Sequence, residues 1–196
     1  MTWGEIQIES LKKMFLNKEI LEISKLEEYK KDKKYKTYLD AMPQACNEAI
    51  NYILSQEPII NVFRLEKTST NAKYDLKKLI TNYKSFHNIV SENFIKWNML
   101  TKNILEVNCW DTGTIDIYYE SYLEPIKRNT SNNEEIELDN EFVRILPLYI
   151  AGELYKDDDL ALSTMYMNEF LENLGINIKN ANAVNNTIRT TYGMEW

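Results

Sequence analysis

Hydrophobic residues in the first 57 positions recur with the period of an α-helix. Thr2 and Glu5 have the spacing of a capping box, so a first helix is expected to begin there. The charged segment 19–35 predicts a second, more exposed helix. A stronger helix is predicted over 35–54, within which Pro43 removes a backbone donor and is expected to kink or restart the helix. Its apolar positions are Tyr38, Leu39, Met42, Ala45, Cys46, Ala49, Ile50 and Ile53.

The pattern changes to that of β-strands between residues 58 and 126. Residues 59–65 form a β-branched and aromatic run, and residues 114–119 alternate apolar with polar side chains. A further apolar run covers 104–109, and the turn after it contains Gly113, so the last two strands are expected to form a hairpin. We therefore predict a small β-sandwich-like module over 58–126.

Helical periodicity returns after a polar segment, 127–137, which is expected to be a linker or loop. Asp139 is a good N-cap for a helix that contains Pro147 as an internal proline. A final helix is expected to end at Gly175. The fold class is therefore predicted as α+β, with the inserted module between the two parts of a helical bundle, because neither helical half looks able to close a core alone. The bundle is expected to comprise 1–57 and 138–175, followed by a C-terminal tail over 176–196.

The composition is that of a globular protein, with 44% hydrophobic residues in a chain of 196. No run of eighteen apolar residues occurs, so no membrane span is expected. The first residues lack the pattern of a signal peptide. Cys46 and Cys109 lie far apart in unlike surroundings, and free thiols in a reducing cytoplasm are favoured over a disulfide.

The formal net charge of −7 argues against a general nucleic-acid binder, which would carry an excess of Lys and Arg. One basic cluster runs against this trend. It is interpreted either as a solvated surface or as a surface that meets DNA passing nearby. The cluster consists of Lys30, Lys31, Lys33, Lys34 and Lys36.

The search for catalytic chemistry is mostly negative. His87 is the single histidine, which excludes a His-His metal site, and no two of the five glycines are close enough for a phosphate-binding loop. Asp157–Asp159, with Glu153 and Glu169 nearby, is the best candidate for a Mg²⁺ or Ca²⁺ site, although helix capping explains aspartates there as well. We expect no catalytic residue, no metal and no cofactor, and hence no enzyme.

Two groups of aromatic residues are candidate binding features. A carbohydrate-binding face on the β-module could be formed by Trp97, Trp110, Tyr118, Tyr119 and Tyr122. The apolar chain end follows an Asn-rich spacer and indicates a segment that docks, either on its own domain or on a partner chain. Its expected partner-binding residues are Ile188, Tyr192, Met194 and Trp196.

Three stretches together resemble the head-tail connector or adaptor proteins of long-tailed bacteriophages that infect Gram-positive bacteria. The first is Thr2-Trp3-Gly4-Glu5 leading to Met14-Phe15. The second is Tyr38-Leu39-Asp40-Ala41-Met42-Pro43 with Asn47-Glu48-Ala49-Ile50. The third, and most specific, is Leu146-Pro147-Leu148-Tyr149-Ile150-Ala151 with Leu154-Tyr155-Lys156-Asp157-Asp158-Asp159 and Asn168-Glu169-Phe170. The closing Tyr192-Gly193-Met194 also fits, whereas the β-module matches only loosely.

The resemblance implies a structural virion protein of packed helices, without catalytic residues, that assembles as a ring, commonly of twelve copies. The ring would lie beneath the portal protein in the neck, after assembly in the host cytoplasm. It would extend the DNA channel without sequence-specific binding and dock a head-closure or tail-completion protein. An acidic lining suits DNA that must slide rather than stick. The alternative is another tail or baseplate component whose β-module binds a host glycan.

Overall fold

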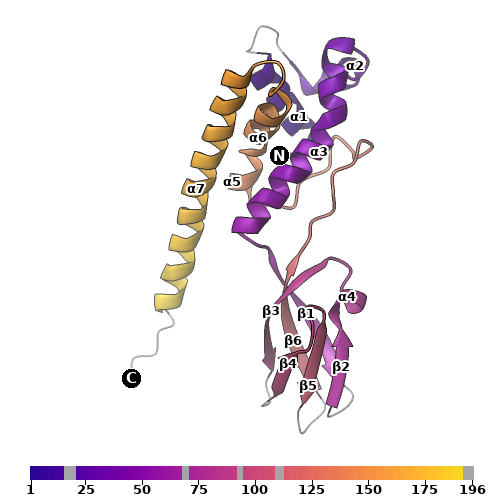
Figure 1. Ribbon diagram of the computed structural model, residues 1–196, viewed down its shortest axis with the longest axis vertical. Helices are drawn as coiled ribbons and strands as arrows, with labels where there is room; N and C mark the ends of the chain where they lie inside the picture. The colour runs from indigo at the N-terminus through magenta and orange to yellow at the C-terminus, as the bar shows by residue number, and fades with distance from the viewer. Residues whose placement is uncertain (16–20, 68–70, 92–94, 109–112, 192–196) are drawn as a thin grey trace. The chain divides into compact units, whose positions relative to one another are not determined.

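The computed structural model has an α+β fold that divides into two compact units (Figure 1). It describes residues 1–15, 21–67, 71–91, 95–108 and 113–191, with backbone only for 180–191. The helical unit comprises Met1–Glu57 and Pro125–Trp196, and the β unit comprises Pro58–Glu124. The inserted module had been predicted over 58–126.

Helix α6 (Leu146–Leu154) lies at the centre of the helical unit. It packs against α1 (Trp3–Met14), α3 (Lys33–Gln56) and α7 (Leu160–Thr191), as Figure 1 shows. A helix with three packing partners needs apolar residues on nearly all sides. Six of its nine residues are buried, namely Leu146, Pro147, Leu148, Ile150, Ala151 and Gly152. The remaining elements are short: η1 (Ile23–Lys25), α2 (Leu26–Tyr29) and α5 (Asn140–Val143).

Pro43 and Pro147, the two prolines expected inside helices, both differ from the expectation. Helix α3 runs unbroken through Pro43, so the predicted restart there is wrong. The missing N–H of a proline removes one helical hydrogen bond, which packing over a 24-residue helix outweighs. Pro147 is not internal, because it lies in the first turn of α6, where the backbone N–H would have no helical acceptor.

Helix α7 does not end at Gly175, as the sequence had indicated, but continues to Thr191. The predicted tail over 176–196 therefore begins as helix. A glycine ends a helix when it adopts a left-handed conformation, and Gly175 does not do so. Its backbone remains helical because the penalty for glycine inside a helix, about 1 kcal/mol relative to alanine, does not stop propagation.

The polar segment 127–137 is a loop with a structural role, because its backbone carbonyls accept hydrogen bonds from the first N–H groups of α1. The backbone N–H of Trp3 donates to the carbonyl of Glu134 at 2.8 Å, and that of Gly4 donates to Asn132 at 2.9 Å. The first N–H groups of a helix lack internal acceptors, so these carbonyls satisfy them. The side chain of Asn132 also binds Glu27 and Lys30 of the α2 region, at 3.0 and 3.2 Å.

The β unit contains two antiparallel three-stranded sheets. The first sheet has the order β1 (Ile60–Lys67), β6 (Gly113–Ser121), β3 (Tyr83–Ser91). The second has the order β2 (Asn71–Asp75), β5 (Ile104–Asn108), β4 (Lys96–Met99). One turn of helix, α4 (Leu76–Leu79), follows β2.

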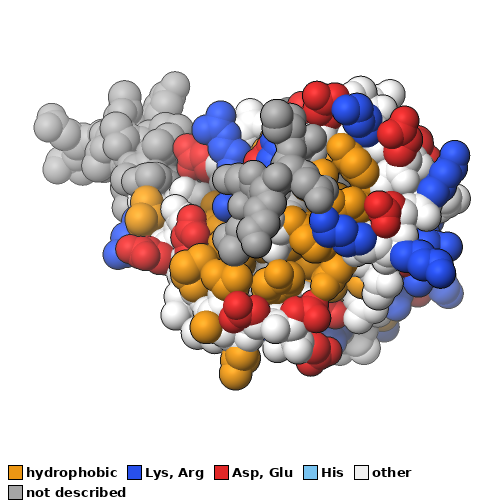
Figure 2. Space-filling view, turned by 90° about the horizontal axis from the view of Figure 1, so that it is seen from above, with side chains coloured by type: hydrophobic (Ala, Val, Ile, Leu, Met, Phe, Trp, Pro, Cys, Tyr) orange, Lys and Arg blue, Asp and Glu red, His pale blue; other side chains and the backbone are white. Residues whose placement is uncertain are grey.

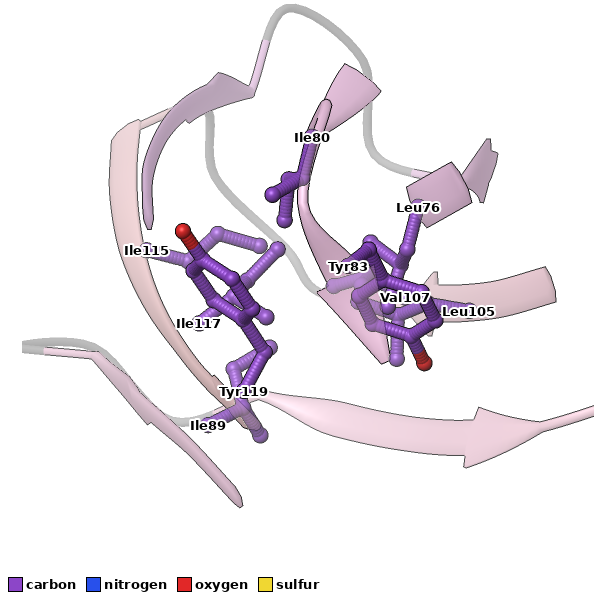
Figure 3. Close-up of a cluster of buried hydrophobic side chains, with 9 residues drawn as sticks. All are labelled: Leu76, Ile80, Tyr83, Ile89, Leu105, Val107, Ile115, Ile117 and Tyr119. Atoms are coloured by element: carbon purple, nitrogen blue, oxygen red, sulfur yellow. The ribbon is translucent and has the colours of Figure 1, made fainter. Parts of the chain in front are cut away.

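A single hydrophobic cluster joins the two sheets (Figure 3). Strand β6 contributes Ile115, Ile117 and Tyr119, and β5 contributes Leu105 and Val107. Alternate residues of a strand point to one face, so one face of each sheet supplies this core. The arrangement matches the predicted β-sandwich-like module. The full cluster is Leu76, Ile80, Tyr83, Ile89, Leu105, Val107, Ile115, Ile117 and Tyr119.

The predicted hairpin between the last two strands is wrong. Strand β5 pairs with β2 and β4, whereas β6 pairs with β1 and β3. The chain therefore passes from one sheet to the other between residues 108 and 113. Both strands bring their apolar residues to the shared core from opposite sheets, which buries them as a sandwich rather than side by side.

Candidate functional site

The three stretches that carry the family resemblance meet at one corner of the helical unit. The rings of Phe15 and Tyr38 lie 5.6 Å apart in an edge-to-face arrangement. The hydroxyl of Tyr38 donates to Oδ2 of Asp158 at 2.5 Å. Tyr38 of the second stretch therefore contacts one residue from each of the other two stretches. We call this group, together with Tyr35 and Lys34, the aromatic corner.

The ends of two helices position the aromatic corner. Phe15 is the C-cap residue of α1, while Tyr35 and Tyr38 lie three positions apart near the start of α3 and so share a face. Phe15 and Tyr35 pack edge to face with ring centres 5.0 Å apart. Nζ of Lys34 lies 5.2 Å from the centre of the Phe15 ring and 4.9 Å from that of Tyr35. Cation–π attraction therefore holds this lysine over the two rings.

A cavity of about 460 Å³ opens beside the aromatic corner. Lys33 and Lys34 on α3 line one side, while Asp157 and Asp158 in the turn between α6 and α7 line the other. The remaining lining residues are Thr37, Tyr38, Ala41 and Leu154. A cavity with a cation on one wall and carboxylates on the other suits a polar segment that carries both donors and acceptors.

Tyr38 is held in its protonated form. Its hydrogen bond to Asp158 and, to a smaller extent, burial raise the pKa of the phenol to about 12. The phenol is therefore a donor at neutral pH and fixes the Asp158 carboxylate on the cavity wall. A general acid or base works best with a pKa near the working pH, and the raised pKa of Tyr38 does not suit it to that role.

In the acidic cluster at Asp157–Asp159, Asp159 caps a helix. Oδ1 of Asp159 accepts hydrogen bonds from the backbone N–H groups of Ala161 and Leu162, at 3.0 and 3.1 Å, and so caps α7, as capping predicted. Glu153 forms an ion pair with Lys156. Over the part of the chain that the structure describes, no three His, Cys, Asp or Glu side chains group closely enough to hold a metal ion.

Two lysines of the basic cluster, Lys30 and Lys34, make contacts with neighbouring side chains. Nζ of Lys30 binds Glu27 at 2.6 Å, and Lys34 covers the two rings, while Lys31, Lys33 and Lys36 are exposed. Figure 2 shows acidic and basic side chains interspersed around a central hydrophobic area on one face of the molecule. A surface with both signs of charge does not give the continuous basic stripe that DNA binding requires.

The predicted glycan-binding aromatics of the β unit that the structure describes do not share one face. Tyr119 is buried in the core, while Tyr118 precedes it on the strand and points to the opposite side of the sheet. Trp97 packs against Phe86 with ring centres 5.0 Å apart. Trp110 lies outside the described residues, and Tyr122 is exposed beyond the end of β6. This geometry does not favour the glycan-binding interpretation.

Cys46 and His87, two residues of types that can act as nucleophile or base, belong to different units. Cys46 is a buried free thiol in the helical unit, and burial raises its pKa to about 12. His87 is exposed on β3 in the β unit. A thiol needs a lowered pKa to be a nucleophile, so Cys46 is a packing residue. Among the described residues, no helix is both long and apolar enough to cross a membrane.

The expected docking residues can be placed only in part. Ile188 belongs to α7, but its side chain lies outside the described part of the chain. Tyr192, Met194 and Trp196 also lie outside the described residues. Sequence reasoning missed the aromatic corner, although the spacing of Tyr35 and Tyr38 on one helix face was a signal for it. Asn132 offered no signal, because its backbone carbonyl acts regardless of side chain.

No protein-family model matches the chain, and no curated protein matches it significantly. The family resemblance therefore rests on the residues quoted for it in the sequence alone.

Proposed function

We propose that this chain is a non-catalytic structural protein of a tailed bacteriophage, an adaptor in the neck that joins the DNA-filled head to the tail. In this role it forms a ring under the portal protein, extends the DNA channel and docks the next neck or tail protein. One observation carries the proposal: the three stretches that resemble the family, far apart in sequence, come together through Phe15, Tyr38 and Asp158.

The distribution of charge supports the proposal. Residues 58–124 hold eight Lys and Arg residues and eight Asp and Glu residues, so the whole formal charge of −7 belongs to the helical unit. DNA adheres to proteins through Lys and Arg contacts with phosphate. An acidic helical unit facing the channel would let DNA pass without adhering.

The aromatic corner is the surface that we assign to the docked neck protein. Its cavity presents Lys33 on one wall and Asp157 on the other, beside the rings of Phe15 and Tyr38. Interfaces favour aromatic residues with charged neighbours at their rim. The C-terminal residues Ile188, Tyr192, Met194 and Trp196 remain a proposed second docking segment.

The first test is deletion of the gene from the phage genome that carries it, followed by electron microscopy of the lysate. The expected result is full-length tails and separate heads that do not join, with the wild-type gene supplied on a plasmid restoring complete particles. Leakage of DNA from the separate heads would place the protein at head closure. Normal infectious particles without the gene would contradict the proposed function.

A pair of complementing variants tests the aromatic corner. Asp158→Lys removes the acceptor of Tyr38 and reverses the charge on one cavity wall, whereas Asp40→Lys makes the same charge change at an exposed position on α3. Provided that circular dichroism shows both variants folded, Asp40→Lys is expected to restore joined particles and Asp158→Lys is not. Equal restoration would remove the corner from the docking surface.

A further inference from the structure

Strand β1 lies at one side of its sheet, where β6 is its only partner among the described strands. The N–H of Ser121 donates to the carbonyl of Ile59 at 3.1 Å, so alternate residues from Ile59 onward face β6. The residues between them direct their backbone N–H and C=O groups away from the sheet. Those of Ile60, Val62 and Glu66 form no hydrogen bond within the part of the chain that the structure describes. We call the outward backbone of Ile60–Lys67 the β1 edge.

The strands at the other three sides of the two sheets are less suited to accept a further strand. The register of β3 with β6 shifts at two points, and β2 and β4 are only five and four residues long. Bulges and short strands protect a sheet edge from pairing with another chain. In contrast, β1 has eight residues in unbroken register and contains no proline. Among the described strands, β1 therefore offers the longest regular edge.

The core of the β unit is incompletely covered beside the β1 edge. Phe63 and Leu65 are on the core-facing side of β1 and lie opposite Ile117 and Ile115 of β6, which are buried. Phe63 and Leu65 themselves are only partly buried. A strand added beside β1 would cover them further, which is favourable in proportion to the apolar area removed from water.

The outward side chains of β1 indicate what an added strand must carry. Ile60 and Val62 are 37 and 52% exposed, and the exposed carboxylate of Glu66 has no partner among the described residues. Arg64, between them, forms a two-point contact with Asp116, at 2.8 and 2.9 Å. Directly opposed side chains on antiparallel strands favour apolar pairs and pairs of opposite charge. The complementary strand therefore has apolar residues opposite Ile60 and Val62 and a Lys or Arg opposite Glu66.

We propose that the β1 edge binds an extended segment of another protein by strand addition, with that segment antiparallel to β1. Backbone hydrogen bonds give such a contact its affinity, and alternate side chains give it specificity. A second copy of β1 is a poor match, because antiparallel pairing along most of the strand would place Ile60 and Val62 of one copy opposite the charged end, Arg64 to Lys67, of the other. The inference concerns the β unit alone and is independent of the neck role.

A synthetic peptide with the sequence Lys-Val-Thr-Ile-Ile-Thr-Val has the complementary pattern and is the probe. Antiparallel to β1, its lysine would lie opposite Glu66, and its second isoleucine and last valine would lie opposite Val62 and Ile60. With a fluorescent label, it is expected to bind the full chain with a dissociation constant below about 1 mM, measured by fluorescence anisotropy. The control peptide is N-methylated at the alternate residues whose N–H groups would face β1. It is expected to bind at least about tenfold more weakly, because the backbone donors are removed.

Two variants at one position test the edge itself. Val62→Pro removes an N–H that points away from β6, and proline is tolerated on an edge strand when its nitrogen faces solvent. This variant is expected to remain folded by circular dichroism and to bind the peptide at least about tenfold more weakly. Val62→Thr is the matched control, because it keeps both the N–H and the β-branched shape. Its affinity for the peptide is expected to lie within about threefold of the wild type.

The outcomes are distinct. Peptide binding that both N-methylation and Val62→Pro weaken supports the proposal. Absence of binding at about 1 mM overturns it, as does equal binding of the N-methylated peptide, which would mean that side chains alone are recognised. If Val62→Pro does not fold, the two peptides compared on the wild-type chain decide. A sedimentation mass that rises above 23.2 kDa with concentration, and that Val62→Pro returns to 23.2 kDa, would make a second copy the occupant and overturn the proposed partner.

Discussion

Tyr38 and Asp158 form a hydrogen bond between residues 120 positions apart, at the point where α3 meets the turn before α7. A hydrogen bond to a charged acceptor is stronger than one between neutral groups. Both side chains retain contact with solvent, which screens that advantage. The bond therefore positions the cavity wall more than it stabilises the fold.

Removing the Tyr38 hydroxyl gives a prediction for the dependence of stability on pH. Tyr38→Phe is expected to lower the free energy of unfolding by about 1 kcal/mol or less at pH 7. The pKa of Tyr38 is raised to about 12 from an ordinary value near 10, so this contribution is present below pH 10 and is lost as the pH rises toward 12. Urea unfolding at pH 7 and about pH 11 measures it.

The matched control is Tyr122→Phe in the β unit, where the hydroxyl has no hydrogen-bond partner among the described residues and is expected to contribute almost nothing. A Tyr38→Phe effect of equal size at both pH values would contradict the role assigned to the raised pKa.

Single residues also show how far local sequence predicts a contact. The capping box was predicted from spacing, and it is confirmed: Oγ1 of Thr2 accepts from the N–H of Glu5 at 3.3 Å, and the Glu5 carboxylate accepts from the N–H of Thr2 at 2.8 Å. The adjoining contact was not predictable. A Cβ on Gly4 would lie 3.0 Å from the carbonyl oxygen of Asn132, so glycine at this position allows the loop 127–137 to approach α1 closely. The sequence of that loop has no hydrophobic pattern from which the contact could be predicted.

At the scale of elements, the backbones of α6 and α7 approach closely at Gly152. A Cβ on Gly152 would lie 3.2 Å from the carbonyl oxygen of Ser163 and 3.3 Å from the backbone nitrogen of Met167. The hydroxyl of Ser163 in turn donates to the carbonyl of Gly152 at 2.7 Å. A Cβ at Gly152 would therefore make tight contacts that require the backbone of α7 to move by a few tenths of an ångström.

The same substitution at two glycines is expected to have opposite effects on stability. Gly152→Ala forces α6 and α7 apart and is expected to cost about 1–3 kcal/mol of unfolding free energy. At Gly175 the added Cβ meets nothing within 4 Å, so Gly175→Ala is expected to gain about 0.5–1 kcal/mol from helix propensity alone. Thermal or urea unfolding compares them. Destabilisation by Gly175→Ala would mean that α7 needs a glycine there.

The kinds of element were more predictable than their pairing. Alternation over 114–119 indicated a strand because successive side chains of a strand point to opposite faces of the sheet, one buried and one in solvent. The structure has β6 at Gly113–Ser121. Pairing depends on residues far away: β5 and β6 looked like a hairpin, but the cluster that both bury lies between two sheets. Gly175 was misread for a related reason, since a glycine signals a helix end only when its backbone leaves the helical region.

At the scale of the whole molecule, the chain segments at which the β unit begins and ends lie next to each other in space. The N–H of Ser121 donates to the carbonyl of Ile59 at 3.1 Å, and Ile60 pairs with Glu120. The core cluster of the β unit lies within residues 58–124. Each unit therefore has the packing expected of an independently folding domain.

Separating the two units gives the corresponding prediction. Residues 58–124 expressed alone are expected to unfold cooperatively, and a chain that joins Glu57 to Pro125 through a short Gly-Ser linker is expected to retain a cooperative helical transition. Far-ultraviolet circular dichroism against temperature measures both. Because a domain this small is only marginally stable, the β unit is expected to have the lower midpoint. Loss of the helical transition after excision would show that the helical unit requires the insert.

The neighbouring crossings also determine how the protein bears tension. Both chain ends belong to the helical unit, so a pull between them loads the helical packing first. Only when the two helical segments part does force reach the β unit, and it then acts on Ile60 and Glu120, a pair at one end of antiparallel strands. Force applied there opens β1 and β6 like a zip, one pair at a time, which takes less force than sliding whole strands past each other. The helical unit thus acts as a mechanical latch for a module that would yield easily without it.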